Sequence, residues 1–170
     1  MPQLLLATDF ATYKELSLNI DDTTRINPYI LQAQQFDLKP LVGEVFYKDM
    51  LDNPTSAENT LLLNGGTYSY QNTNYEFSGL KIVLAYYAYA RIIENQNIHV
   101  TRFGVVFKNN ADVSERVDEK TLQRLIIQAR NQARAYWDEC LLFLNRKSTS
   151  YPLWANHSTT KPRINISAVG

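Results

Sequence analysis

Few side chains in this sequence are of the types that carry out metal or nucleophilic chemistry. The two histidines, His99 and His157, and the single cysteine, Cys140, are widely separated along the chain. Zinc sites combine His and Cys at short, regular spacings, so this pattern disfavours a metal site. Cys140 falls within the apolar stripe of a predicted helix, where a thiol is expected to be buried and inert.

Paired carboxylates and adjacent glycines are present, but their surroundings favour structural roles. Asp21 and Asp22 precede Thr23 in an expected turn, where solvated or capping carboxylates are common. Gly65-Gly66 ends a predicted helix and lacks the spacing of a phosphate-binding loop. We therefore expect no catalytic residues, no metal and no cofactor, and we do not expect an enzyme.

The overall composition is that of one folded domain. The chain has 170 residues, of which 45% are hydrophobic and 20% are charged. Its single cysteine excludes an internal disulfide and suits a reducing compartment. The N-terminal residues lack a basic lead-in, so no signal peptide is expected. The most apolar run, residues 80–93, contains two basic residues and is shorter than a membrane span, so we expect no membrane segment.

Charge is balanced over the whole chain but not along it. The net charge is zero, which disfavours a general nucleic-acid-binding protein. Residues 1–78 carry four Lys/Arg and ten Asp/Glu, whereas residues 79–170 carry thirteen and seven. The two halves either neutralise each other within one fold or bind between copies. In the second case the contact is head-to-tail, and such contacts can close into rings.

The periodicity predicts a mainly α-helical fold with a small β element. We expect a short helix from Asp9, then a helix capped by Asn27 with Pro28 at its first position. Further helices are expected over residues 40–51 and, after Thr55 as N-cap, 56–64. Alternating aromatic residues predict a β-hairpin over about 66–77, whose aromatic face should lean on helices. The helix of residues 80–97 is apolar on nearly every side, so it is either the central helix of the domain or is also covered by a second subunit.

The last and longest helix is expected over residues 114–144, as a rod of about 45 Å. An apolar stripe containing Ile126, Ala133 and Cys140 lies on one side. The opposite side carries a basic stripe with Ile127 in its middle, formed by Arg116, Lys120, Arg124, Arg130 and Arg134. This stripe is either a solvated face or the contact for a partner, such as an acidic neighbour or DNA phosphates.

Two further segments are candidates for contacts between subunits. A strand over about 102–108 places Phe103, Val105 and Phe107 on one face and Val106 on the other. Its partner is either the hairpin of the same chain or a neighbour's segment, and we favour a mixed sheet near the subunit boundary. The tail has no helical period but contains Tyr151, Leu153 and Trp154. We expect these residues to dock on another subunit, the alternative being packing on their own helices.

Several stretches occur in an order that is typical of one family. They are "NPYILQAQQFDLKPLVGEVFYKDML", "LLLNGGTYSY…YEFSGLKIVLAYYAYARII", "TRFGVVFKNN" and "YPLW". In these stretches the chain resembles structural proteins of tailed phages of Bacteroides and its relatives, including crAss-like phages. The similar proteins are head-to-tail connector, ring or adaptor proteins, and the resemblance covers about residues 24–155.

The resemblance implies a helical-bundle adaptor without catalytic residues. Such a protein would assemble with itself as a ring, typically of twelve copies, in the virion neck between the portal and the other neck or tail proteins. DNA would pass through the lumen without sequence specificity, and assembly would take place in the host cytoplasm. On this basis we expect a helical connector domain over 1–145 and an extended C-terminal arm over 146–170. A tail-completion or minor tail protein, or a small DNA-binding accessory protein, are the alternative functions.

Overall fold

The computed structural model describes residues 2–14, 22–95, 98–101, 104–107 and 118–154. The described chain is mainly α-helical, with two small antiparallel sheets, which agrees with the expected fold class. The helices are α1 (Ala7–Tyr13), α2 (Asp22–Ala33), the π-helix η1 (Gln34–Leu38), α3 (Lys39–Val42), α4 (Glu44–Asp52), α5 (Ala57–Asn64), α6 (Leu80–Asn95) and α7 (Glu119–Arg146). The strands are β1 (Gly66–Tyr70), β2 (Thr73–Phe77), β3 (Ile98–Thr101) and β4 (Gly104–Phe107).

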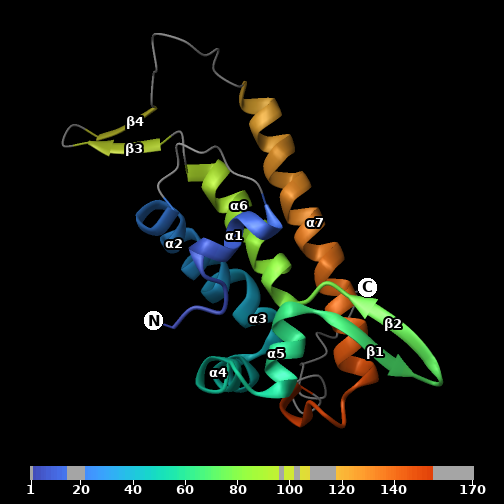
Figure 1. The fold of residues 1–170 in the computed structure, drawn as a ribbon. Coiled ribbons are helices and arrows are strands. Elements are labelled where there is room, and N and C mark those ends of the chain that lie inside the picture. The colour runs from blue at the N-terminus through green and yellow to red at the C-terminus, as the bar shows by residue number, and fades with distance from the viewer. Residues whose placement is uncertain (1, 15–21, 96–97, 102–103, 108–117, 155–170) are drawn as a thin grey trace, which may run out of the picture.

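Helix α6 is the central helix of the bundle. It packs along α7 on one side and against α1 and α2 on the other (Figure 1). Because it has neighbours on several sides, its apolar residues can cover almost its whole circumference, and Leu84, Ala85 and Ala88 are completely buried. The prediction of a central helix is therefore confirmed.

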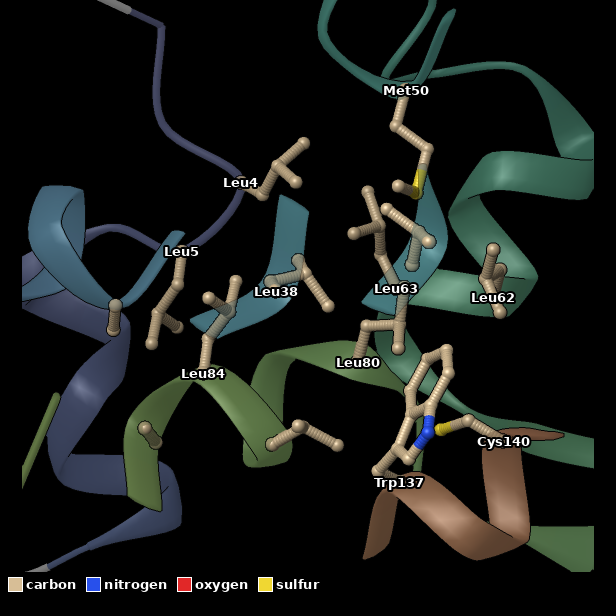
Figure 2. Close-up of a cluster of buried hydrophobic side chains, with 14 of the residues drawn as sticks. Leu4, Leu5, Leu38, Met50, Leu62, Leu63, Leu80, Leu84, Trp137 and Cys140 are labelled. Carbon is tan, nitrogen blue, oxygen red and sulfur yellow. The ribbon is translucent and has the colours of Figure 1, made fainter. Parts of the chain in front are cut away.

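One continuous hydrophobic core joins the N-terminal segment to the helices. Leu5 and Leu38 meet Leu84 of α6, while Leu62 of α5 lies near Trp137 of α7 (Figure 2). Every element that contributes to this core therefore loses apolar contacts if its neighbour is displaced.

Helix α2 begins earlier than the sequence indicates. Pro28 lies inside α2 rather than at its first position, and Asn27 is helical rather than a cap. The residue before a proline usually avoids helical geometry. Here Ile26 and Ile30, one turn apart, are both buried. We attribute the difference to this tertiary burial, which outweighs the local preference.

A π-helix follows α2 and changes which residues point inward. The wider turn of η1 leaves Phe36 exposed over 64% of its surface, although the helical period placed it beside Ile30 and Ala33. Gln34 instead is fully buried. Its side chain accepts a hydrogen bond from the Leu4 amide (2.8 Å) and donates to the Pro2 carbonyl (3.0 Å) and the Tyr47 hydroxyl (2.9 Å). These bonds fix the N-terminal segment on the bundle.

Two helix starts show how capping sets the element boundaries. The N-cap of α5 is Ser56, whose Oγ accepts the amide of Asn59, and not the neighbouring Thr55 as expected. Helix α7 begins after Asp118, whose Oδ1 accepts the Thr121 amide at 2.9 Å. Hydrogen bonds from Thr121 hold the pKa of Asp118 below its ordinary value. The expected start of this helix at residue 114 lies outside the described residues.

The β1–β2 hairpin leans its aromatic face on α7, as predicted. Tyr68 pairs with Tyr75 across the hairpin. Phe77 stacks on Phe143 of α7 with ring centroids 4.0 Å apart. The Arg146 guanidinium donates to the Tyr68 hydroxyl at 2.9 Å. Because an isolated hairpin is marginal in water, these contacts supply the support it needs.

Two glycines join the base of this hairpin to the bundle. Gly65 and Gly79 both have positive φ, +78° and +80°. A Cβ on Gly65 would lie 2.5 Å from the Phe77 carbonyl oxygen, and one on Gly79 would lie 2.3 Å from the Gly65 nitrogen. The chain entering the hairpin therefore touches the chain leaving it, at a distance that admits no side chain.

Gly65→Ala should lower the free energy of unfolding by at least about 2 kcal/mol, because it adds left-handed strain to a backbone clash. Chemical denaturation followed by circular dichroism measures this loss. Gly66→Ala is the comparison: its φ of +148° is also strained for alanine, but its Cβ would meet only the Leu61 side chain, at 3.1 Å, so the difference between the variants reports the backbone clash. Equal losses for the two variants would contradict the importance of the glycine contact.

The strand expected over about 102–108 has a partner that the sequence did not indicate. Gly104–Phe107 forms β4 and pairs antiparallel with β3 of the same chain, with Val106 opposite His99. Within the described chain this strand does not join the β1–β2 hairpin, because the two hairpins form separate sheets. The favoured mixed sheet between two subunits stays a prediction. Phe103 lies outside the described residues.

Candidate assembly surface

The outer face of α7 carries exposed apolar side chains and exposed cations on one long helix. The inner face packs on the bundle through a stripe that includes Ala129, Ala133 and Cys140, in agreement with the predicted apolar stripe. On the opposite face Ile127 is 57% exposed and Leu142 is 54% exposed. The outer face thus presents two large apolar side chains to solvent, about 22 Å apart along the helix.

Basic side chains surround Ile127 on this outer face. Lys120, Arg124 and Arg134 are exposed and make no ion pair within the described part of the chain. A shallow, open hollow lies among the first turns of α7, lined by Glu119, Lys120, Gln123, Arg124 and Ile127. Arg116, the first residue of the predicted basic stripe, lies outside the described residues.

Arg130 differs from the other members of the basic stripe, because its charge is satisfied within the chain. Its guanidinium lies 3.3 Å from Glu94 and 3.7 Å from Asp37. Asp37 also binds Arg91 through two hydrogen bonds of 2.7 and 3.0 Å, and its side chain is only 10% exposed. Within the described chain Arg130 thus joins α7 to η1 and α6, and its expected contact with a partner stays a prediction.

The same ion pairs bear on the two oppositely charged halves of the chain. Asp37 with Arg91 and Arg130, and Asp9 with Lys81 at 4.0 Å, are contacts between the acidic and the basic half. Part of the charge separation is thus neutralised within one fold. At the α4–α5 end, Glu44 and Glu58 are exposed, so acidic groups remain on the surface there.

Arg91→Met should lower the free energy of unfolding by about 3 kcal/mol, because it leaves the mostly buried Asp37 carboxylate without its bidentate partner. Lys39→Met is the matched control, since Lys39 pairs with the exposed Glu44 and should contribute below about 1 kcal/mol. Combining Arg91→Met with Asp37→Asn should recover part of the loss in urea unfolding. A loss from Arg91→Met no larger than the control's would contradict this assignment.

The tail residues pack on their own chain, and the expectation that they dock on another subunit is wrong for Tyr151 and Trp154. Trp154 is 1% exposed, and its ring meets Trp137 edge-to-face at 6.0 Å. The Tyr151 hydroxyl donates to the Glu58 carbonyl at 2.8 Å. Leu153 is half-buried against the same core. Burial raises the pKa of Tyr151 above its ordinary value. The aromatic residues that suggested an external anchor instead close one end of the bundle.

Trp154→Ala should therefore destabilise the subunit itself by about 3–5 kcal/mol, the usual range for removing a large buried aromatic side chain. Leu153→Ala, at a half-buried site, should cost less. Denaturant unfolding at a concentration where the protein is monomeric measures both effects. An unchanged midpoint for Trp154→Ala, together with weaker self-association, would instead support docking on a neighbour.

Side chains for chemistry are not brought together in the described residues. Cys140 is fully buried, and burial raises its pKa to about 12, so the thiol is held in its unreactive protonated form. No group of three His, Cys, Asp or Glu side chains in the described part of the chain could hold a metal ion. No helix among the residues described is long and apolar enough to cross a membrane.

Sequence reasoning found Ile127 on the basic face but missed Leu142. The signal for Leu142 was available, because an apolar residue on the polar side of a helical wheel is the same anomaly as Ile127. Arg130 could not be distinguished from Arg124 and Arg134 by the wheel. Its partner Asp37 is distant in the sequence and is turned inward by a π-helix.

Residues 38–164 match the model of DUF6712, which is described as a family of unknown function. Because the match covers more than half of the 170 residues, the chain belongs to this family. No curated protein and no solved structure matches the chain.

Proposed function

We propose that this protein is a virion structural subunit that assembles as a ring in the neck of a tailed phage, between the portal and the tail. The observation that carries the proposal is the outer face of α7. There Ile127 is exposed among Lys120, Arg124 and Arg134, and Leu142 is exposed about 22 Å further along a rod of 28 residues, or about 42 Å. Apolar and cationic side chains exposed together suit a subunit that acts by contact with other subunits.

The four stretches that resemble connector proteins lie in the elements that build the helical bundle, which is consistent with a structural role. They form α2 to α4, α5 to α6 with the β1–β2 hairpin, β4 and the closing turn at Tyr151. They therefore specify the packing of one bundle rather than a reactive centre. The partners proposed are further copies of the chain, the portal, and other neck or tail proteins, with DNA passing through the lumen.

A DNA-binding accessory protein is the alternative that the three cations of the outer face favour. Phosphate contacts would make use of Lys120, Arg124 and Arg134, but they give no role to the exposed Ile127 and Leu142. The two functions differ in a simple measurement, because a phosphate-binding surface shifts duplex DNA in a salt-dependent manner.

Native mass spectrometry and negative-stain class averages of the full-length protein test the proposed ring. The expected result is a closed particle of a single copy number, with twelve as the number implied by the resemblance. Only monomers at all concentrations, or a salt-sensitive DNA complex without self-association, would overturn the proposal.

Reversing Arg124 and Arg134 to Glu should weaken self-association roughly tenfold while leaving helicity unchanged, because exposed charges contribute little to folding. The matched control reverses Arg25 and Lys48, two exposed cations on α2 and α4. Sedimentation velocity gives the assembled fraction. A similar effect of both pairs would mean that net charge, rather than the α7 face, controls association.

A further inference from the structure

Seven exposed positions of α7 form a strip whose spacing is symmetric about its central residue. Lys120, Arg124, Ile127, Asn131, Ala135, Asp138 and Leu142 are all exposed and fall within about 80° of one another around the helix. Their spacings of three and four residues are those of a helix that packs along a second helix. The positions also lie four, seven and eleven residues to either side of Asn131, so the strip has the same spacing in both directions.

We infer that the outer face of α7 pairs antiparallel with the same face of a second copy, about a two-fold axis at Asn131. In this arrangement each position faces the one at equal distance on the other side of Asn131. Arg124 then faces Asp138 of the second copy, and the symmetry forms this opposite-charge pair twice. Ile127 faces Ala135, so a large apolar side chain meets a small one, as interdigitating helices require.

The shape of the α7 surface provides an independent argument. The hollow is lined by Glu119, Lys120, Gln123, Arg124 and Ile127, of which the last four lie at i, i+3, i+4 and i+7. Four residues at this spacing form the hole that receives a side chain in knobs-into-holes packing. The symmetry about Asn131 brings Asp138 of the second copy to this hole, where the two cations Lys120 and Arg124 outnumber the carboxylate of Glu119.

Arg130 lies outside the exposed strip and takes no part in this pairing. Because Arg130 is bound to Asp37 and Glu94, it lies along the side of α7 that faces η1 and α6. Asp138 makes no ion pair with the residues that the structure describes, so its carboxylate is available for Arg124. The pairing needs only a second copy of the chain and therefore does not depend on the proposed ring.

A cysteine at the axis tests the arrangement directly. Asn131→Cys should be joined to its symmetry mate by a short bifunctional thiol reagent, giving a covalent dimer on a denaturing gel. Gln132→Cys is the matched control, because it is equally exposed but lies about 100° away around the helix. Cys140 is buried and protonated in both variants, so it should not react. Equal dimer yields for the two variants would overturn the pairing.

Exchanging the charges of Arg124 and Asp138 distinguishes contact with a second copy from contact with a different partner. Arg124→Asp should weaken dimerisation about tenfold, since it places two like charges opposite each other twice. Adding Asp138→Arg within the same chain should restore it, because the exchanged pair remains complementary only if a copy binds its own face. Failure of the double variant to recover would overturn the inference in favour of a different acidic partner or DNA. Ring formation is measured separately by native mass spectrometry, and that measurement tests only the proposed function.

Discussion

The carboxylate of Asp37 links the packing of the helices to the choice of the face that α7 exposes. It lies in a π-helix, is mostly buried, and binds Arg91 of α6 and Arg130 of α7. A buried carboxylate is costly to leave unpaired, so both helices are held at fixed rotations about their axes. With Arg130 turned towards Asp37, the neighbouring Arg124 and Ile127 must face outward. The rotation that exposes this face of α7 is thus coupled to an interaction on the neighbouring side of the same helix.

The regular elements could be predicted because their determinants are local. Apolar residues at helical spacing specified α6 and the inner face of α7, and alternating aromatics specified the β1–β2 hairpin. The structure departs from the prediction where contacts between residues distant in the sequence determine the local conformation. The burial of Ile26 extends α2 through Pro28, and a π-helix rotates Phe36 outward. Strand β3 was missed because its four residues, Ile98–Thr101, follow α6 closely and carry little pattern of their own.

The candidate surface was predictable only in part, for the same reason. A helical wheel shows which cations lie opposite the core, but it does not show which of them the rest of the fold neutralises. The tail was mispredicted for the same reason. Tyr151 and Trp154 are residue types that often anchor contacts between subunits, but here they complete the core of their own chain. A ring closes by head-to-tail contacts, whereas two identical faces of α7 meet by a two-fold axis. One α7 face can make only one of these two contacts, so a subunit that pairs about the two-fold axis must close a ring through another surface.

The contact between Trp137 and Trp154 has a consequence for optical studies of this protein. These are its two tryptophans, and their rings meet at 79° where the closing turn packs on α7. Tryptophan fluorescence, excited at a wavelength that the eleven tyrosines do not absorb, therefore reports a single location in the fold, where the C-terminal turn packs on the bundle. Helices α1 to α6 and both hairpins contain no indole and are silent in this signal. Detachment of the turn would change the emission before any helix unfolds, so fluorescence and circular dichroism follow different events in this chain.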